Sequence, residues 1–299
     1  MARGDLTNSE RAQLEPHLPK NTGRGGRWKR HRQVINGILF RMRTGIPWRD
    51  LPRRFGSWQT CYDRHRHRHR HRRWSAEGTW ERIVRAVQAG ADADGRIDWS
   101  LVSVDSTVCR AHQHAAGARK QAPRKTGKRT RPAQHRPDEA LGRSRGGLTM
   151  KIHLAGEGGL RPCGHAGHPR SVGRCPQMIP VLERLRVPRP DGGHPRTRPD
   201  HLSGDKAYSL HRNRRCLRRR QIKHTIPERR DQQAHRLRRG SNGGRPTGFD
   251  AARYARRDEV ERLINRLKAN RAVARCFDKR AYVFYGTVTV AALRLWFCA

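Results

Sequence analysis

The chain has 299 residues, enough for about two domains of ordinary size and too many for a mini-protein. Its 67 Lys and Arg against 25 Asp and Glu give a formal net charge of +42, which argues against an acidic or neutral metabolic enzyme. A polyanion compensates such a charge well, because Lys and Arg replace the counterions condensed on its phosphates. We therefore expect a nucleic acid as the partner.

The chain lacks the features of an exported or membrane-bound protein. Residues 1–20 contain acids and prolines instead of the apolar run of a secretory signal. No apolar stretch reaches the roughly 20 residues that a bilayer demands, so no membrane partner is expected. The seven Cys are scattered without a C-x-x-C pair, which favours reduced thiols over a disulfide framework. These features predict a soluble, cytoplasmic protein, and one this basic is expected to associate with the nucleoid.

Residues 1–95 predict a helical module. Within 31–43 apolar residues recur at three- and four-residue intervals, which is typical of an amphipathic helix with one buried face. A second helix is expected from about Ser57, with Trp58 and Tyr62 on its buried side. Two basic helices around a turn are compatible with a helix-turn-helix and equally with a plain helical bundle. In the first case the second helix offers base edges three outward side chains, Gln59, Thr60 and Arg64.

A low-complexity repeat, RHRHRHRHRR, occupies residues 64–73. A His-rich tract can bind metal, but the alternating Arg places a fixed positive charge beside every imidazole and opposes a divalent cation. Trp74 and Trp80 then begin a further expected helix. The Gly-Ala-Asp run at 90–95 predicts a linker, and we place the domain boundary there.

Residues 96–299 alternate β-prone and apolar-striped helical segments, which favours an α/β or α+β fold. Strands are expected at 99–105, 148–154, 202–205 and 223–226. Helices are expected at 178–185, 210–219 and 251–271. Two stretches rich in Arg and Gly, 110–147 and 236–245, are expected to be loops.

Three acids of this second domain are the candidate catalytic residues. Asp105 and Asp205 each end a short β-prone run, and Glu261 lies in the helix expected at 251–271. Each acid taken singly is explained by a salt bridge to one of the many cations. Together in space they can hold two divalent ions about 3.5 to 4 Å apart, which activates a nucleophile and stabilises a leaving oxygen in phosphodiester chemistry. Oxygen ligands of this kind suit Mg²⁺.

The segment 254–268 carries a motif with the spacing Tyr-x2-Arg-x3-Glu-x6-Lys, at Tyr254, Arg257, Glu261 and Lys268. This motif resembles the Tyr-Arg-Glu-Lys signature of DDE transposases from bacterial insertion sequences, closest to the insertion-sequence-five group. Asp105 in Val-Asp-Ser-Thr and Asp205 in Gly-Asp-Lys-Ala-Tyr resemble the first and second catalytic Asp of that family. The run 45–52, Gly-Ile-Pro-Trp-Arg-Asp-Leu-Pro, is similar to its helical N-terminal module, so the resemblance spans nearly the whole chain.

The resemblance implies a ribonuclease-H-like catalytic domain at 96–299, a mixed sheet with flanking helices, preceded by a small all-α, helix-turn-helix-like DNA-binding module at 1–95. It implies that Asp105, Asp205 and Glu261 bind two Mg²⁺ ions, for which Mn²⁺ can substitute. The implied reaction is hydrolysis at the ends of the element, followed by attack of the freed 3′-hydroxyl on target DNA. The implied partners are the terminal inverted repeats, the target DNA and a second copy in a synaptic homodimer. Further DNA contacts are expected from Tyr254, Arg257 and Lys268.

Two stretches depart from the family pattern. The Arg-His repeat is longer than the corresponding stretch of relatives, and residues 163–175 replace an apolar third strand with almost nothing to bury. One hypothesis for the second departure is a compensated frameshift in a GC-rich gene. The competing interpretation is a zinc site, whose crowded spacing fits no common finger, made of Cys163, His165, His168 and Cys175.

Two alternative functions remain beside the transposase. A damaged third strand would keep the carboxylates apart and leave a catalytically decayed, non-enzymatic basic DNA-binding protein. A ribosomal or nucleoid structural protein explains the charge of +42, but it gives no reason for the motif at 254–268.

Overall fold

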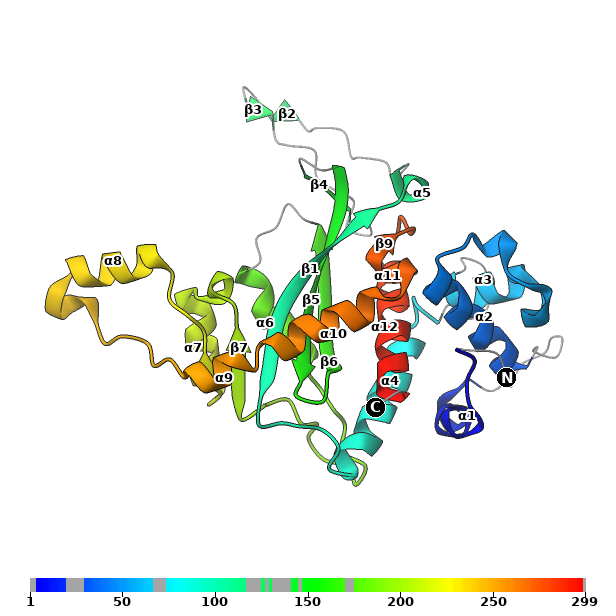
Figure 1. The fold of residues 1–299 in the computed structure, drawn as a ribbon, viewed down its shortest axis with the longest axis horizontal. Helices are drawn as coiled ribbons and strands as arrows, with labels where there is room; N and C mark the ends of the chain where they lie inside the picture. Colours follow the sequence, from blue (N-terminus) through cyan, green and yellow to red (C-terminus); the bar gives the residue numbers. More distant parts are fainter. Residues whose placement is uncertain are drawn as a thin grey trace.

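The computed structural model describes residues 4–19, 30–66, 74–116, 125–126, 129–130, 141–144, 147–169 and 175–297. A group of helices from the N-terminal part lies at one end of the molecule, a twisted sheet lies in the middle, and a helical arm projects from the opposite end (Figure 1). No helix in these described ranges combines the length and apolarity needed to cross a bilayer.

The N-terminal part is helical, as expected. Its helices are α1 (Asn8–Leu14), α2 (His31–Thr44), α3 (Trp58–Arg66) and α4 (Thr79–Ala93). The apolar stripe expected in 31–43 is buried and covers the inner side of α2. The helix ends at Gly45, whose φ of 68° is left-handed and therefore favours glycine.

Three details of this part differ from expectation. On α3 the fully buried side chains are Cys61 and His65, whereas Trp58 and Tyr62 are half-buried. The connection from α2 to α3 spans residues 45–57 and contains two 3-10 turns, longer than the three- or four-residue turn of a helix-turn-helix. The expected linker at 90–95 is mostly helix, because buried Ala91 continues the apolar face of α4.

The Arg-His repeat begins inside α3. Its second residue, His65, is buried and hydrogen-bonds through Nε2 to Thr287 Oγ1 at 3.1 Å. The low-complexity interpretation is therefore wrong for residues 64–66, because tertiary packing recruits them into a helix. Residues 67–73 of the repeat lie outside the described part of the chain.

The central sheet has five principal strands, β1 (Val102–Ala111), β5 (Gly147–Glu157), β6 (Arg161–Pro169), β7 (His201–Gly204) and β8 (Lys223–Thr225). Their order is β6-β5-β1-β7-β8, with β5 antiparallel to β1 and β6, and β7 parallel to β1 and β8. The short strand β4 (Gly142–Ser144) pairs with the start of β5, and the short strand β9 (Arg275–Cys276) pairs with the end of β1. The separate pair β2 (Lys125–Thr126) and β3 (Arg129–Thr130) lies within the stretch expected to be a loop.

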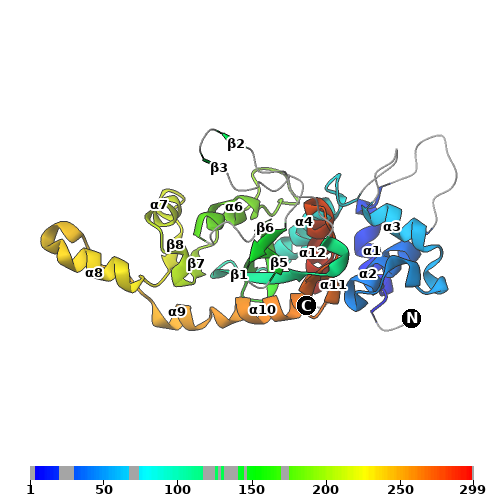
Figure 2. The ribbon, with the colours of Figure 1, turned by 90° about the horizontal axis from the view of Figure 1, so that it is seen from above.

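Helices cover both faces of this sheet, which confirms the expected mixed sheet with flanking helices (Figure 2). One face packs against α6 (Met178–Arg184) and α7 (His211–Arg219). The other packs against α10 (Asp258–Lys268) and α12 (Ala281–Phe297). The helix expected at 251–271 is interrupted, because α9 (Ala251–Ala255), α10 and α11 (Arg271–Ala274) are separated by turns.

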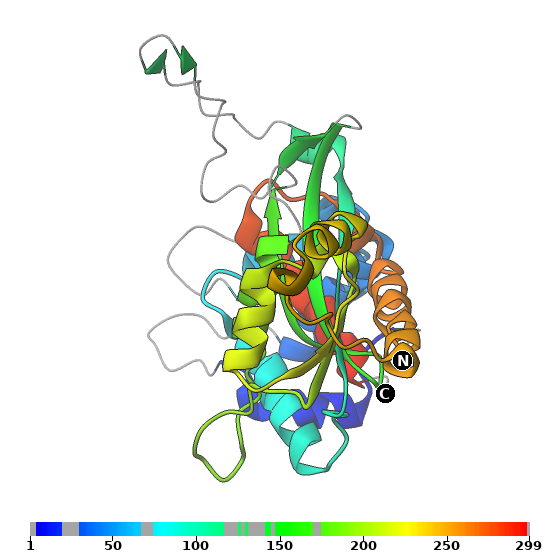
Figure 3. The same cartoon turned by 90° about the vertical axis from the view of Figure 1, so that its left-hand side faces the viewer.

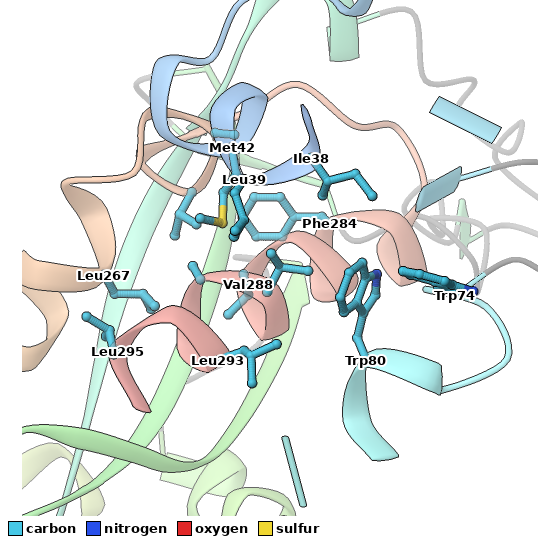
Figure 4. Packing of buried hydrophobic residues seen from close by; sticks show 14 of the residues in the cluster. Ile38, Leu39, Met42, Trp74, Trp80, Leu267, Phe284, Val288, Leu293 and Leu295 are labelled. Atoms are coloured by element: carbon cyan, nitrogen blue, oxygen red, sulfur yellow. The ribbon is translucent and has the colours of Figure 1, made fainter. Parts of the chain in front are cut away.

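The largest apolar cluster joins the N-terminal helices to the rest of the chain. Leu39 and Met42 of α2 lie beside Phe284 of α12, and Leu267 of α10 lies beside Leu295 of α12 (Figure 4). Trp80 of α4 lies edge-on to Trp74, with ring centroids 4.9 Å apart. Because one core continues across residue 95, the domain boundary placed there stays a prediction.

The third strand forms in spite of its composition. Residues 161–169 make β6, which pairs with β5 along its length, and Cys163 and Ala166 are buried. Gly167 lets α12 approach, since a Cβ there would clash with the ring of Tyr285, whose hydroxyl donates to the Gly167 carbonyl at 2.5 Å. The expectation that this stretch has almost nothing to bury is therefore wrong, because small residues allow close backbone packing.

The zinc interpretation of this stretch is tested only in part. His165 bonds through Nε2 to Thr289 Oγ1 at 3.1 Å, and burial, with the nearby charge of Arg184, lowers its pKa to about 4. The side chain of His168 lies outside the described residues. The frameshift hypothesis concerns the gene and stays a prediction.

Candidate active site

The sheet register brings the first two acids side by side. Val104 of β1 pairs with Gly204 of the parallel strand β7, so Asp105 and Asp205 are the next residue on each strand. The strand was expected to end at Asp105. It continues instead, because β5 pairs with β1 as far as Arg110. Strand β7 does end at Gly204, so Asp205 follows it directly. Asp205 therefore lies just after the end of β7, beside Asp105 within the longer strand β1.

The third acid comes from the helix packed on this sheet. The apolar side of α10 is buried through Val260, Leu263, Ile264 and Leu267. Glu261 lies in the first turn of α10, with 51% of its side chain exposed. The junction before α10 is held by Arg256, which donates to Asp98 Oδ2 at 2.9 Å and to Glu259 Oε1 at 2.9 Å. These contacts set the position of Glu261 over the sheet.

Arg257 links two of the three acids. Its Nη1 donates to Asp105 Oδ2 at 3.3 Å, and its Nη2 donates to Glu261 Oε1. Burial alone would lower the pKa of Arg257, but the charges of Asp105 and Glu261 raise it above its usual value. The two carboxylates therefore share one cation, although they are 156 positions apart in the chain (261 − 105).

Asp205 lies beside this pair on the neighbouring strand. Its carbonyl accepts a hydrogen bond from the Tyr208 amide at 2.8 Å, in the short 3-10 turn Lys206–Tyr208. Within the described parts of the chain, no three His, Cys, Asp or Glu side chains are placed to hold a metal ion together. The structure thus brings Asp105 and Glu261 onto one cation and Asp205 into the adjacent register, and the metal-binding role of the three stays a prediction.

A buried histidine under the site was not predicted. His153 on β5 is fully buried, and its Nδ1 lies 2.9 Å from the hydroxyl of the equally buried Tyr208. This hydrogen bond anchors the turn after Asp205 to the middle of the sheet. The only sequence signal was Tyr208 itself, within the Gly-Asp-Lys-Ala-Tyr run, because nothing local marks His153 as its partner.

The expected DNA-contacting residues near the site are partly engaged within the protein. Tyr254 is half-buried, with its ring 5.2 Å from that of Phe249 and 5.8 Å from the guanidinium of Arg257. Lys268 Nζ donates to Thr107 Oγ1 at 3.1 Å. The DNA-binding roles of these residues stay predictions.

The three residues expected to point outward from α3 differ in exposure. Gln59 is exposed, but Thr60 and Arg64 are half-buried. The guanidinium of Arg64 lies over the ring of Trp74, 5.3 Å from its centroid, and 3.3 Å from His31 Nδ1. Packing of α3 against its neighbours therefore leaves Gln59 as the one fully outward side chain of the set.

Comparisons with known proteins identify the family. A family model described as a transposase DDE domain matches residues 98–280, which are 183 of the 299 residues. A second model, for transposases of the IS4/5 family, matches residues 6–84.

Two curated proteins are similar to parts of the chain. The "Insertion element IS402 uncharacterized 16.2 kDa protein" of Burkholderia cepacia is 38% identical over 101 residues, which cover 33% of this chain and 65% of that protein. The "Uncharacterized protein y4sN" of Sinorhizobium fredii is 31% identical over 116 residues, covering 38% of this chain and 83% of that protein. The chain thus spans just under two thirds of the first relative.

Among solved structures, the Mos1 transposase paired-end complex with left transposon end is 10% identical, with a TM-score of 0.27, covering 93% of this chain and 80% of that one. A pre-cleavage Mos1 transpososome matches with the same identity, coverage and TM-score. These similarities are too weak to support an argument.

The sheet order, with Asp105 on β1, Asp205 directly after β7 and Glu261 on a covering helix, is the arrangement expected of a ribonuclease-H-like domain. The chain belongs to the transposase DDE domain family, since that model matches more than half of it.

Proposed function

We propose that the chain catalyses metal-dependent cleavage and strand transfer at the ends of an insertion sequence. The observation that carries the proposal is the shared cation of Asp105 and Glu261, directly beside Asp205. Two carboxylates that converge on one guanidinium could converge on a metal ion in its place. In a chain of this family, that place is the expected site of phosphodiester chemistry.

The donor set fits a divalent metal ion. Asp105, Asp205 and Glu261 would supply only carboxylate oxygens, which suit Mg²⁺ and also Mn²⁺. Two such ions would activate the attacking oxygen and stabilise the leaving oxygen. The Arg257 guanidinium stands in for a cation in the structure, and once displaced it can bind a phosphate through its planar fork of N–H donors. In this proposal Arg257 exchanges a carboxylate partner for DNA.

The proposed partners are the terminal inverted repeats and the target DNA, with two copies of the chain forming the synaptic complex. The net charge of +42 supports a DNA partner, because each phosphate neutralised releases counterions. The same charge supports association with the nucleoid. Base recognition is assigned to the N-terminal module.

Replacement of Gln59 by Ala is expected to reduce the preference for end DNA over random DNA. Gln59 is exposed on α3, and a Gln side chain can bond two groups on an adenine edge, which is worth about 1–3 kcal/mol of discrimination. Competition binding at physiological salt measures the preference. The neighbouring exposed Asp63 offers a control as Asp63→Ala. An unchanged preference in Gln59→Ala would move recognition away from this helix.

Replacement of Lys268 by Ala is expected to weaken binding about equally on all sequences and to lower the salt slope by about one unit. The reason is that Lys268 is assigned to a phosphate and not to a base. Arg262→Ala is the control, because Arg262 lies on the same helix with 58% of its side chain exposed. An unchanged salt slope together with a lower unfolding midpoint would show that Lys268 serves only its hydrogen bond to Thr107.

The function itself is tested by nicking of supercoiled plasmid by the full chain with Mg²⁺, with Mn²⁺ and with EDTA. Nicking with either metal and its loss in EDTA are the expected results. Tight DNA binding without nicking under any condition would support the alternative, a catalytically decayed DNA-binding protein. That alternative supposes a damaged third strand that keeps the carboxylates apart, whereas β6 pairs with β5 and Asp105 and Glu261 meet at Arg257.

A further inference from the structure

A cluster of positively charged side chains lies near the start of β7, whereas Asp205 follows the end of this strand. Here α7, β8 and the segment leading into α9 line an open pocket of about 780 Å³, which we call the basic cavity. Figure 3 shows this end of the molecule, with α7 and the arm helix α8 (Arg230–Arg238) in front of the sheet. The cationic side chains that line it are Arg214, Arg218, Lys223 and Arg245.

The basic cavity has little negative charge of its own. Asp250 is the one carboxylate among its described lining residues, and it is engaged at the start of α9. There Asp250 Oδ1 accepts the Arg253 amide at 3.0 Å, and Oδ2 lies 3.3 Å from Arg253 Nε. Nearby Glu228 is paired with Arg236 at 3.0 Å. The cations of the cavity wall therefore outnumber the acids available to them.

Arg214 is the buried member of this wall, with a relative exposure of 7%. Its Nη2 donates to the Ile226 carbonyl at 2.8 Å, and its Nε donates to the Ser209 carbonyl at 3.4 Å. The remaining Nη1 is buried without a hydrogen-bond partner among the described residues. Burying a guanidinium with an unpaired donor is costly, and the negative charge of an anion in the basic cavity would lower that cost.

Two histidines that line the basic cavity, His201 and His224, have pKa values below the usual range. His201 donates through Nε2 to Thr225 Oγ1 at 2.8 Å, and its Nδ1 accepts from Arg253 Nη1 at 2.6 Å. Burial, together with the charge of Arg253, lowers the pKa of His201 to about 4. Burial also lowers the pKa of His224, and the charges of Arg214 and Arg218 lower it further. Burial is the larger cause of both shifts, and the charges of the neighbouring arginines add to it.

The segment that contains α9 and the start of α10 contacts both the basic cavity and the active site. Arg253 contacts His201 at the cavity, and Arg257, four residues later, contacts Asp105 at the active site. Strand β7 separates them, and its four residues span about 13 Å at roughly 3.3 Å each.

We propose that the basic cavity binds a backbone phosphate of the DNA close to the cleaved bond. The excess of cationic side chains over carboxylates in its lining and the buried charge of Arg214 carry this assignment. It rests on the proposed function, because the cleaved bond is placed at the three acids. Phe249, which lines the cavity with 51% of its surface exposed, offers a ring face to a neighbouring base.

The test compares two arginines of one helix. Arg218 and Arg219 are both exposed on α7, but only Arg218 lines the basic cavity. Affinity for a linear duplex is measured across a salt titration in EDTA, so the readout does not depend on cleavage. Arg218→Gln is expected to lower the salt slope by about one unit and weaken binding, with Arg219→Gln close to the wild-type chain. Equal effects of the two substitutions would overturn the proposal.

A second measurement separates DNA from a free phosphate compound. Inorganic phosphate is titrated into the wild-type chain and into Arg218→Gln by calorimetry at constant ionic strength. Phosphate binding lost in Arg218→Gln, with an unchanged DNA salt slope, would assign the basic cavity to a small phosphate ligand and overturn the DNA assignment. If plasmid nicking is absent but the DNA salt slope falls as expected, the catalytic proposal fails and the phosphate site stands.

Discussion

We expect less than about a tenth of the metal-dependent cleavage rate to remain after any one of the substitutions Asp105→Ala, Asp205→Ala and Glu261→Ala. Ligands of one metal site act as a unit, so removing one should resemble removing all three. DNA affinity should be retained or increased, because each substitution removes a negative charge from a basic surface. The measurement is nicking of supercoiled plasmid in Mg²⁺, with duplex binding recorded for the same preparations.

Asp191→Ala is the matched control for these variants, because Asp191 is an exposed acid of the same domain, away from the central strands. It should nick at the wild-type rate. Arg257 keeps one carboxylate partner in Asp105→Ala and one in Glu261→Ala, so neither substitution leaves its guanidinium without a carboxylate. Any single variant that keeps more than about a tenth of the rate would contradict the assignment of three metal ligands.

Replacement of Phe284 by Ala is expected to lower the free energy of unfolding by about 3–5 kcal/mol. Phe284 is fully buried in the cluster that joins α12 to α2 and α10, so its removal leaves a cavity where three elements meet. Denaturant titration of the full chain measures the loss. A drop below about 1 kcal/mol would mean that this cluster can collapse around the gap and does not hold the junction.

Leu237→Ala is the control for that experiment. Leu237 lies on the projecting helix α8 and is 73% exposed, so its truncation should change stability by less than about 0.5 kcal/mol. The same titrations test the boundary at residue 95. A module that folds by itself would give a second transition in Phe284→Ala, whereas one shared core loses its structure in a single step.

Local pattern predicted most of the elements correctly. The periodicity of 31–43 gave α2, and the β-prone runs near Asp105 and Asp205 gave β1 and β7. Where prediction failed, a tertiary contact outweighed composition. The Arg-rich stretch 236–245 begins within α8, and the Gly-containing stretch 163–169 forms most of β6, where Gly164 and Gly167 leave room for the neighbouring helices.

From the sequence we could predict the helical N-terminal part and the α/β part that follows it, and the charge led to the expectation of a nucleic-acid partner. These properties depend on charge, periodicity and spacing along the chain. The tertiary structure alone decided which distant residues meet, namely Asp105 with Glu261 through Arg257, His153 with Tyr208, and Arg253 with His201. The physical reason is that strand order and helix packing select one partner for each cation among many, and no local pattern encodes that selection.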